Sequence, residues 1–225
     1  MNNYDAIVIG AGHNGLTNAA YLAKAGLKVA ILERNPYIGG ATVSRELHKG
    51  WYYSNCSYVC SLLRPEIARD LELPRHGLQV VPFGGGATFM RNGDHLGNYH
   101  DHDRHYREMA RHSKRDANAY ERYTADVTKQ TRLIRPFLMR TPPDPTSMKP
   151  RDLSDLLDFA KAFLNMGEAG LADTIAFWTK SVGDYLGEYF ETDVIKAHMA
   201  GSGIIGTALG VYSPGTAYVL LHHYM

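Results

Sequence analysis

The feature that most constrains this chain is a glycine-rich turn near the amino terminus, Gly10-Ala11-Gly12-His13-Asn14-Gly15, with G-x-G-x-x-G spacing. The apolar run Ala6–Ile9 precedes it, Leu16–Lys24 has the composition of a helix, and a second apolar run, Leu27–Leu32, ends at Glu33. This order predicts a βαβ unit with both strands buried in a parallel sheet. An acid about 20 residues beyond the glycines is typical of a dinucleotide-binding unit.

Each residue type in this pattern suits such a ligand. Gly10 allows a sharp exit from the strand, Gly12 lets a pyrophosphate approach the backbone, and Gly15 lets the helix pack closely on the strands. The start of the helix offers unpaired N–H groups and a positive dipole end to the phosphates. Glu33 can accept hydrogen bonds from ribose hydroxyls, and its charge would repel a 2′-phosphate. A glycine-rich turn without a ligand is the alternative. The preceding strand, the following helix, the returning strand and the acid at its end all argue against it.

A second glycine pair, Gly39-Gly40, follows six and seven residues after Glu33. It adds bare backbone near the pyrophosphate, which plain nicotinamide-binding units do not need; the alternative is a simple turn. The combination resembles the two-dinucleotide-binding-domain flavoproteins, in which Glu-Arg and the glycine pair hold FAD. The resemblance implies that FAD is bound, with Glu33 at the adenosine ribose. The residues expected to bind it are Gly10, Ala11, Gly12, Asn14, Gly15, Glu33, Arg34, Gly39, Gly40, Ala41 and Thr42.

Composition excludes several other classes of protein. The 225 residues are 44% hydrophobic and 21% charged, which is sufficient for a folded core. A formal net charge of +1 implies no nucleic-acid partner. The weakly polar stretch Met199–Leu221 contains serines, a proline and five glycines, so we expect no membrane-spanning helix. Because the chain enters its first strand almost at once, we expect no leader sequence and a cytoplasmic location.

The chain has two cysteines, Cys56 and Cys60. So few cysteines argue against a disulfide framework and favour a reducing compartment. Their C-x-x-x-C spacing differs from the C-x-x-x-x-C of glutathione-reductase-like redox disulfides, and we predict buried or half-buried thiols. They lie in an aromatic stretch, Trp51–Leu63, which either lies beside a flavin ring or packs in the ordinary way under a loop.

The elements between the first unit and residue 99 follow from local signals. Proline at a first turn favours a helix, proline in an apolar run favours an edge strand, and Asn-Gly favours a hairpin turn. We predict an irregular segment over Val43–Gly50, a helix over Pro65–Leu73, an edge strand over Leu78–Phe83, and a hairpin of Thr88–Arg91 and His95–Tyr99 around Asn92-Gly93.

The chain after Tyr99 is predicted to be mostly helical. Asp103–Met139 should form two helices, because Ser113 and Asp116 resemble a capping box at a new start. The apolar face of the second helix is expected to be Ala117, Tyr120, Thr124, Val127, Thr131, Ile134 and Leu138. A proline-rich loop follows, and then come the predicted helices Arg151–Met166, Leu171–Phe190 and Thr192–Ala200, with a break at Gly167–Gly170.

Histidines gather between residues 95 and 112 among several aspartates. A metal site is one interpretation, but no H-x-x-x-H pair stands with a carboxylate at a recognisable metal spacing. We predict a solvated, titratable loop and assign no metal ligand. The residues are His95, His100, His102, His105 and His112.

Six stretches resemble the phytoene-desaturase-like FAD enzymes of the carotenoid and retinoid oxidoreductase group, and most of all the branch typified by pyridine nucleotide-disulfide oxidoreductase domain-containing protein 2. The resemblance implies an α/β fold with a Rossmann-like FAD-binding βαβ unit, a β-hairpin and a mostly helical substrate-domain portion. It places the first FAD-binding segment at residues 1–75 and a partial substrate domain at 76–225. The stretches are Val8–Leu16, Leu32–Glu46, Ser57–Ile67, His112–Tyr123, Phe177–Glu191 and Ser213–His223.

The sequence after Ser213 stops inside an apolar helical pattern, and the predicted parallel sheet needs more strands than the chain supplies. We therefore expect this to be the amino-terminal part of a longer protein, incomplete at the C-terminus.

The resemblance implies an FAD-dependent, desaturase- or dehydrogenase-like oxidoreductase that passes hydride between an apolar small-molecule substrate and the flavin. No acid, base or nucleophile can be assigned. The alternatives are a flavin amine oxidase, a non-catalytic lipid carrier like the Rab GDP-dissociation inhibitors, and an inactive truncated fragment. The intact glycines and Glu33 favour an enzyme. Peripheral contact with a membrane is compatible with this reading, and the oligomeric state stays open.

Overall fold

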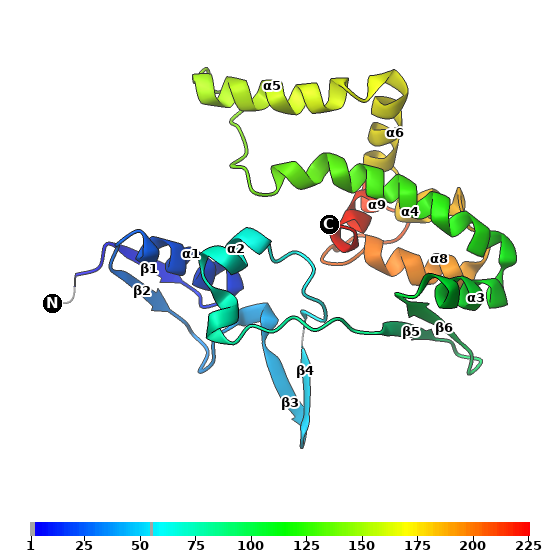
Figure 1. The fold of residues 1–225 in the computed structure, drawn as a ribbon, viewed down its shortest axis with the longest axis horizontal. Helices are drawn as coiled ribbons and strands as arrows, with labels where there is room; N and C mark the ends of the chain where they lie inside the picture. The colour runs from blue at the N-terminus through cyan, green and yellow to red at the C-terminus, as the bar shows by residue number, and fades with distance from the viewer. Residues whose placement is uncertain (1–2, 55) are drawn as a thin grey trace. The chain divides into compact units, whose positions relative to one another are not determined.

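The computed structural model describes residues 3–54 and 56–225. These residues form two compact units, one that ends at Pro82 and one that begins at Phe83. The first unit contains short strands and two α-helices, and the second unit is mostly helical with one β-hairpin (Figure 1). Mixed α/β architecture is thus confirmed, while the predicted assignment of 1–75 and 76–225 to separate functional domains stays a prediction.

The predicted βαβ unit is present. Strand β1 (Ala6–Ile9) leads through the glycine turn into helix α1 (His13–Lys24), and β2 (Val29–Leu32) returns. The two strands pair in parallel over all four residues, as a crossover through a helix requires. Val8 lies toward the helix, because a Cβ built on Gly15 would come 3.4 Å from its Cγ1.

The prediction that both strands are buried is wrong for the described residues. Ile7, Ile9 and Leu32 are 61%, 87% and 58% exposed. The physical reason is that β1 and β2 make a sheet of two strands, so helix α1 covers one face and the other stays open. Apolar composition alone predicted burial but could not show what would cover each face.

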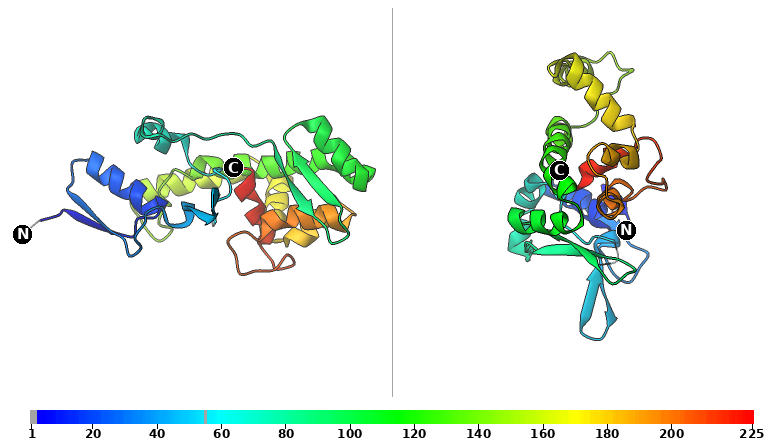
Figure 2. Two further views of the ribbon diagram at one scale, coloured as in Figure 1. Left: turned by 90° about the horizontal axis from the view of Figure 1, so that it is seen from below. Right: turned by 90° about the vertical axis from the view of Figure 1, so that its right-hand side faces the viewer.

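A second hairpin follows the helical turn η1 (Gly40–Thr42). Strands β3 (Ser44–His48) and β4 (Trp51–Ser54) pair antiparallel and project as a separate ribbon (Figures 1 and 2). The prediction of an irregular Val43–Gly50 is therefore wrong. Nearly every residue of both strands is exposed. The strands therefore lack the alternation of apolar and polar residues from which a strand could have been predicted.

The residues around this hairpin correct two more predictions. Trp51 and Tyr52 are 62% and 69% exposed, so these rings do not pack under a loop. Cys56 and Cys60 are both exposed and both free, so the expectation of buried thiols is wrong. They follow the hairpin in a segment without helix or strand, where no packed layer covers them.

Helix α2 (Pro65–Asp70) confirms the predicted proline-started helix, and a short turn, η2 (Leu73–His76), extends it. Its end is fastened to α1, because the hydroxyl of Tyr21 donates to Asp70 Oδ2 at 3.1 Å and Lys24 Nζ donates to the Asp70 carbonyl. The predicted edge strand at Leu78–Phe83 is absent: these residues are irregular and exposed, and no neighbouring strand bonds to them.

The second unit begins with the predicted hairpin. Strands β5 (Gly85–Phe89) and β6 (His95–Tyr99) pair antiparallel around the Asn92-Gly93 turn, where Gly93 takes a positive φ of 84°. The turn is held by Arg111, whose guanidinium donates to Asp94 at 2.7 Å.

The long helical region divides in two, as predicted, into α3 (His102–His112) and α4 (Lys114–Ile134). Ser113 caps α4, since its Oγ accepts from the Asp116 N–H at 3.1 Å. Asp116 does not close the capping box. Its fully buried carboxylate instead accepts from the backbone N–H groups of Glu191 and Thr192, each at 2.9 Å.

Helices fill the rest of the unit. Gly167 takes a positive φ of 70° and separates two helices, but it starts the second one rather than a loop. The predicted helix over Leu171–Phe190 is broken at Lys180-Ser181, where Ser181 caps a new helix by accepting from the Asp184 N–H at 3.0 Å. The elements are η3 (Arg135–Phe137), α5 (Pro150–Leu164), α6 (Gly167–Thr179), α7 (Val182–Gly187), α8 (Asp193–Ala200), η4 (Gly201–Gly203), α9 (Thr216–Val219) and η5 (Leu220–His223).

The core of the second unit is aromatic and centres on Tyr123 of α4, which is fully buried. Its ring lies 5.3–6.2 Å, centroid to centroid, from five other aromatic rings, distances at which aromatic pairs attract. The predicted apolar face omitted Tyr123 and wrongly included Leu138, which is 38% exposed. The partners of Tyr123 are Tyr120, Tyr185, Tyr189, Phe190 and Tyr224.

The prediction of a solvated loop for the histidine-rich stretch is wrong for His105. This residue belongs to α3 and is only 7% exposed, with its ring 4.5 Å from that of Tyr120. Burial, and then the nearby His198 and His102, lower the pKa of His105, while Glu108 acts weakly in the opposite sense. Burial also lowers the pKa of His198, whose Nδ1 bonds to the Thr88 hydroxyl at 2.7 Å.

No helix in residues 3–54 and 56–225 is long and apolar enough to cross a membrane.

The buried carboxylate of Asp116 generates a stability prediction. Asp116→Ala should lower the free energy of unfolding by about 3 kcal/mol, because two backbone N–H groups lose a buried, charged acceptor. Asp193→Ala is the control: its carboxylate is exposed, and losing its ion pair with Lys196 should cost less than about 1 kcal/mol. Urea unfolding followed by Trp178 fluorescence measures both. Equal losses in the two variants would contradict the structural role of Asp116.

The buried histidines predict an acid-sensitive fold. A histidine whose pKa is lower in the folded than in the unfolded chain favours the folded state fully above about pH 6.5. That stability is lost as the pH falls below 6.5 toward the folded pKa, because the unfolded chain then binds more protons. We expect the free energy of unfolding to be lower at pH 5 than at pH 7.

Two variants test whether the buried histidines cause this pH dependence of stability. His105→Gln should flatten part of the pH dependence, whereas His100→Gln, at an exposed position, should leave it unchanged. Urea unfolding across pH 5–8 provides the measurement. If His105→Gln kept the whole wild-type slope, burial of His105 would not be its cause.

Candidate dinucleotide-binding site

The two glycine loops of the first unit are bonded to each other. The Gly39 N–H donates to the Ala11 carbonyl at 2.8 Å, and Gly12 and Gly39 form a parallel bridge. The Gly10 N–H donates to the carbonyl of Leu32, the last residue of β2, at 2.7 Å. The segments after both strands are thus held together at the carboxyl edge of the sheet, the edge where ligands bind in folds of this kind.

Three glycines in these loops meet requirements that other residues could not. Gly10 has a φ of 96°, which the sharp exit from β1 requires. A Cβ on Gly15 would lie 2.1 Å from the Gly10 carbonyl oxygen, so only glycine lets α1 approach so closely. Gly40 has a φ of 58°, and its Cβ would lie 2.9 Å from the Gly12 Cα. The predicted roles of Gly10 and Gly15 agree with this geometry.

The amino-terminal end of α1 opens beside these loops. Gly12 is its N-cap residue and provides no side chain to cap it, and the first turn contains no acidic residue. The first N–H groups of a helix have no partner within the helix, and its dipole is positive there. Asn14 is exposed in this first turn. The arrangement leaves backbone donors for an anionic group such as a diphosphate.

The Glu33 carboxylate faces the first glycine loop. Its Oε2 accepts from the Ala11 N–H at 2.7 Å, and its Oε1 accepts from the Asn35 N–H at 2.8 Å and the Asn35 Nδ2 at 3.0 Å. These bonds, first from the Asn35 backbone and then from Ala11, lower the pKa of Glu33. The group is therefore a charged acceptor at neutral pH, suited to hydroxyl donors and unsuited to a second phosphate.

The other predicted residues lie on or beside the second loop. Arg34 and Ala41 are exposed, and the Thr42 hydroxyl donates to the Gly39 carbonyl at 2.7 Å, which stabilises the loop. Asn35 was not predicted. Its signal was present in the sequence as a short polar donor two residues after the acid, a spacing at which local hydrogen bonds are common.

These residues fit a dinucleotide. Bare backbone lies at Gly12 and Gly40, free helix N–H groups lie at the start of α1, and a fixed carboxylate stands at the end of β2. Gly10, Ala11, Gly12, Gly15, Glu33 and Gly39 are brought together by the contacts above. Gly40 lies against Gly12, Asn14 lies in the first turn of α1, Arg34 follows Glu33, and Ala41 and Thr42 lie in η1. The binding roles of all eleven predicted residues stay predictions.

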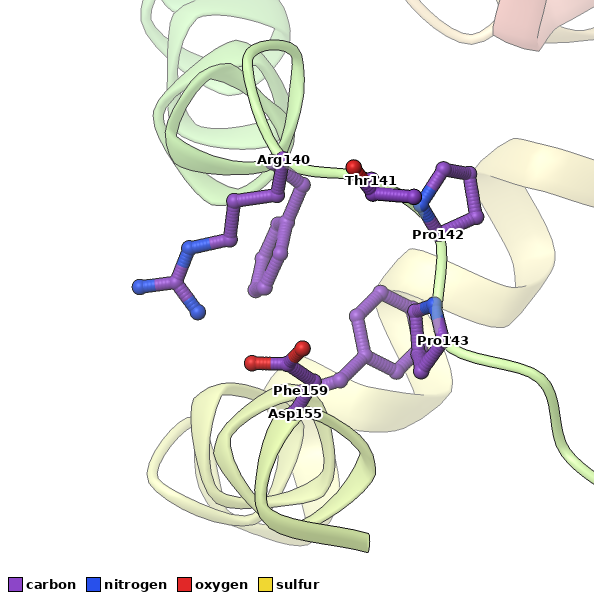
Figure 3. Close-up of a pocket in the computed structure, with 7 residues that line it drawn as sticks. Arg140, Thr141, Pro142, Pro143, Asp155 and Phe159 are labelled. Carbon is purple, nitrogen blue, oxygen red and sulfur yellow. The ribbon is translucent and has the colours of Figure 1, made fainter. Parts of the chain in front are cut away.

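Two other features lie apart from these loops. In the part of the chain that the structure describes, no group of three His, Cys, Asp or Glu residues could hold a metal ion. A small apolar pocket lies in the second unit, between α5 and the turn after η3. Figure 3 shows the charged ends of Arg140 and Asp155 on one side of it and the rings of Pro142 and Pro143 on the other. None of the predicted site residues lines this pocket.

Comparison with known proteins agrees with the fold of the first unit. Residues 8–68 match the NAD(P)-binding Rossmann-like domain family. Pyridine nucleotide-disulfide oxidoreductase domain-containing protein 2 of Mus musculus is 37% identical over 237 aligned residues, which cover 99% of this chain and 41% of that protein. A phytoene desaturase of Fusarium fujikuroi is 65% identical over 100 residues, covering 39% of this chain and 17% of its own length.

A solved structure of putrescine oxidase bound to putrescine matches 98% of this chain with a TM-score of 0.54 and 17% identity, covering 41% of that enzyme. At this identity the likeness concerns the fold alone. The chain spans about two fifths of the length of the mouse relative that it matches. The described loops and the family match agree on a Rossmann-like dinucleotide-binding fold for residues 8–68.

Proposed function

We propose that this chain contains the first dinucleotide-binding segment of an FAD-dependent oxidoreductase that acts on an apolar small molecule, followed by part of its substrate domain. The observation that carries this proposal is the pair of glycine loops bonded through Ala11, with the Glu33 carboxylate bonded to the same residue. A nicotinamide-binding unit needs the first loop and the acid but not the second loop. The extra loop, Gly39–Thr42, therefore favours FAD.

The chain's residues have separate tasks in this proposal. The N–H groups at the start of α1 bind the diphosphate, and Gly12 and Gly40 keep the approach free of side chains. Glu33 accepts hydrogen bonds from the adenosine ribose. FAD, when bound, supplies the hydride acceptor. We assign no catalytic acid, base or nucleophile to the described residues.

The relatives support an oxidoreductase and, over a shorter matched stretch, an apolar substrate. The mouse relative bears the name of an oxidoreductase domain, and the matched stretch of a phytoene desaturase is consistent with oxidation of an apolar substrate. Desaturation as such is the finer part of the proposal. The putrescine oxidase likeness does not favour amine oxidation, because it concerns fold only.

We also propose a cytoplasmic location and no nucleic-acid partner. Two free, exposed cysteines suit a reducing compartment. A net charge of +1 provides no broad attraction for a polyanion.

A flavin titration tests the cofactor. FAD added to the purified protein should show changes in flavin absorbance and quenched or shifted fluorescence. Glu33→Ala should weaken binding by about 1.5–3 kcal/mol, roughly 10- to 150-fold in Kd, because charge-assisted bonds to the ribose are lost. Glu72→Ala removes the same charge from an exposed pair with Arg75 and should bind FAD like the wild type.

A colourless protein that neither retains nor quenches FAD would contradict the proposal and favour a lipid carrier. Unchanged FAD affinity in Glu33→Ala would reject the ribose role of Glu33 while leaving FAD binding itself supported.

A further inference from the structure

Asn35 donates two hydrogen bonds to the Glu33 carboxylate. Its backbone N–H and its side-chain Nδ2 both donate to Oε1, at 2.8 and 3.0 Å. The third bond runs from the Ala11 N–H to Oε2 at 2.7 Å. The carboxylate is thus held from both sides, by the first glycine loop and by the residue two positions after Glu33.

This clamp matters because glutamate is a flexible side chain. Ordering it costs on the order of 1–2 kcal/mol of rotamer entropy. Glu33 is only partly buried, so its hydrogen bonds contribute to holding its rotamer. A carboxylate that is already oriented before the ligand arrives spares that cost at the moment of binding.

The backbone donor of residue 35 would be present with any residue except proline, but the Nδ2 donor requires asparagine or a close substitute. Asparagine and aspartate have the same shape, yet aspartate has no N–H and carries a charge when ionised. At this position an aspartate would place a second carboxylate about 3 Å from the first, and like charges this close repel strongly.

We propose that Asn35 is a positioning residue that orients the Glu33 carboxylate for the ribose of a bound adenine dinucleotide. This inference rests on the proposed function for its ligand. Asn35 acts through Glu33, and the side-chain bond that it donates to the ionised carboxylate is independent of the glycine backbone.

FAD titrations of matched variants test the role. Asn35→Ala should weaken FAD binding roughly 5-fold, the effect of one lost hydrogen bond. Asn35→Asp should weaken it by more than about 10-fold at pH 7.5 and recover toward wild type at pH 5, as the added carboxyl takes up a proton and becomes a donor. Asn18→Asp adds the same charge to an exposed position of α1 and should stay within about twofold of wild type at both pH values.

A second readout does not depend on FAD. Carbon-13 NMR titration of the glutamate carboxyl groups should show the pKa of Glu33 below its usual range in the wild type and higher in Asn35→Ala. A pH-dependent affinity of Asn35→Asp together with this pKa change supports the proposal.

Wild-type affinity and pH profile in Asn35→Asp, tighter FAD binding in Asn35→Ala, or an unchanged Glu33 pKa would each overturn it. If the wild type bound no FAD, the proposed function would fail, and the NMR titration would still decide whether Asn35 orients Glu33.

Discussion

The dinucleotide site depends on the two hydrogen bonds of one buried residue, Ala11. Its N–H donates to Glu33 and its carbonyl accepts from the Gly39 N–H, so three segments meet at a single residue. Ala11 is 2% exposed, and bonds at such a position exchange poorly with water. The acid, the first loop and the second loop therefore take their positions together, and none could shift far without breaking a bond at Ala11.

The second unit is organised by a different constraint. Aromatic side chains surround Tyr123. In addition, the buried Asp116 carboxylate joins the start of α4 to the backbone before α8. Both features bury groups that need specific partners: a tyrosine hydroxyl, which meets that of Tyr224 at 3.2 Å, and a charge that meets two N–H donors. Such cores favour one packing over its alternatives, since a misplaced helix leaves polar groups unpaired.

Local patterns predicted the elements with strong signals. The βαβ unit, the proline-started α2, the Asn-Gly hairpin and the new helix after Ser113 each depend on a few adjacent residues. Predictions failed where the outcome depended on distant partners. The β3–β4 ribbon has no apolar period, Leu78–Phe83 has no strand beside it, and the exposure of Cys56 and Cys60 depends on what packs above them. The burial of His105 likewise comes from Tyr120 and the neighbouring helices.

The amino-acid sequence by itself determined the residue types at the site: glycines where a side chain would clash, an acid after the second strand, and a second glycine pair. These choices are local, because positive φ values and the absence of a Cβ are properties of single residues. Only the tertiary structure decided that both loops meet at Ala11 and that Glu33 faces the first loop. Those contacts depend on the parallel pairing of β1 with β2, which brings together groups 22 residues apart at distances that no spacing rule specifies.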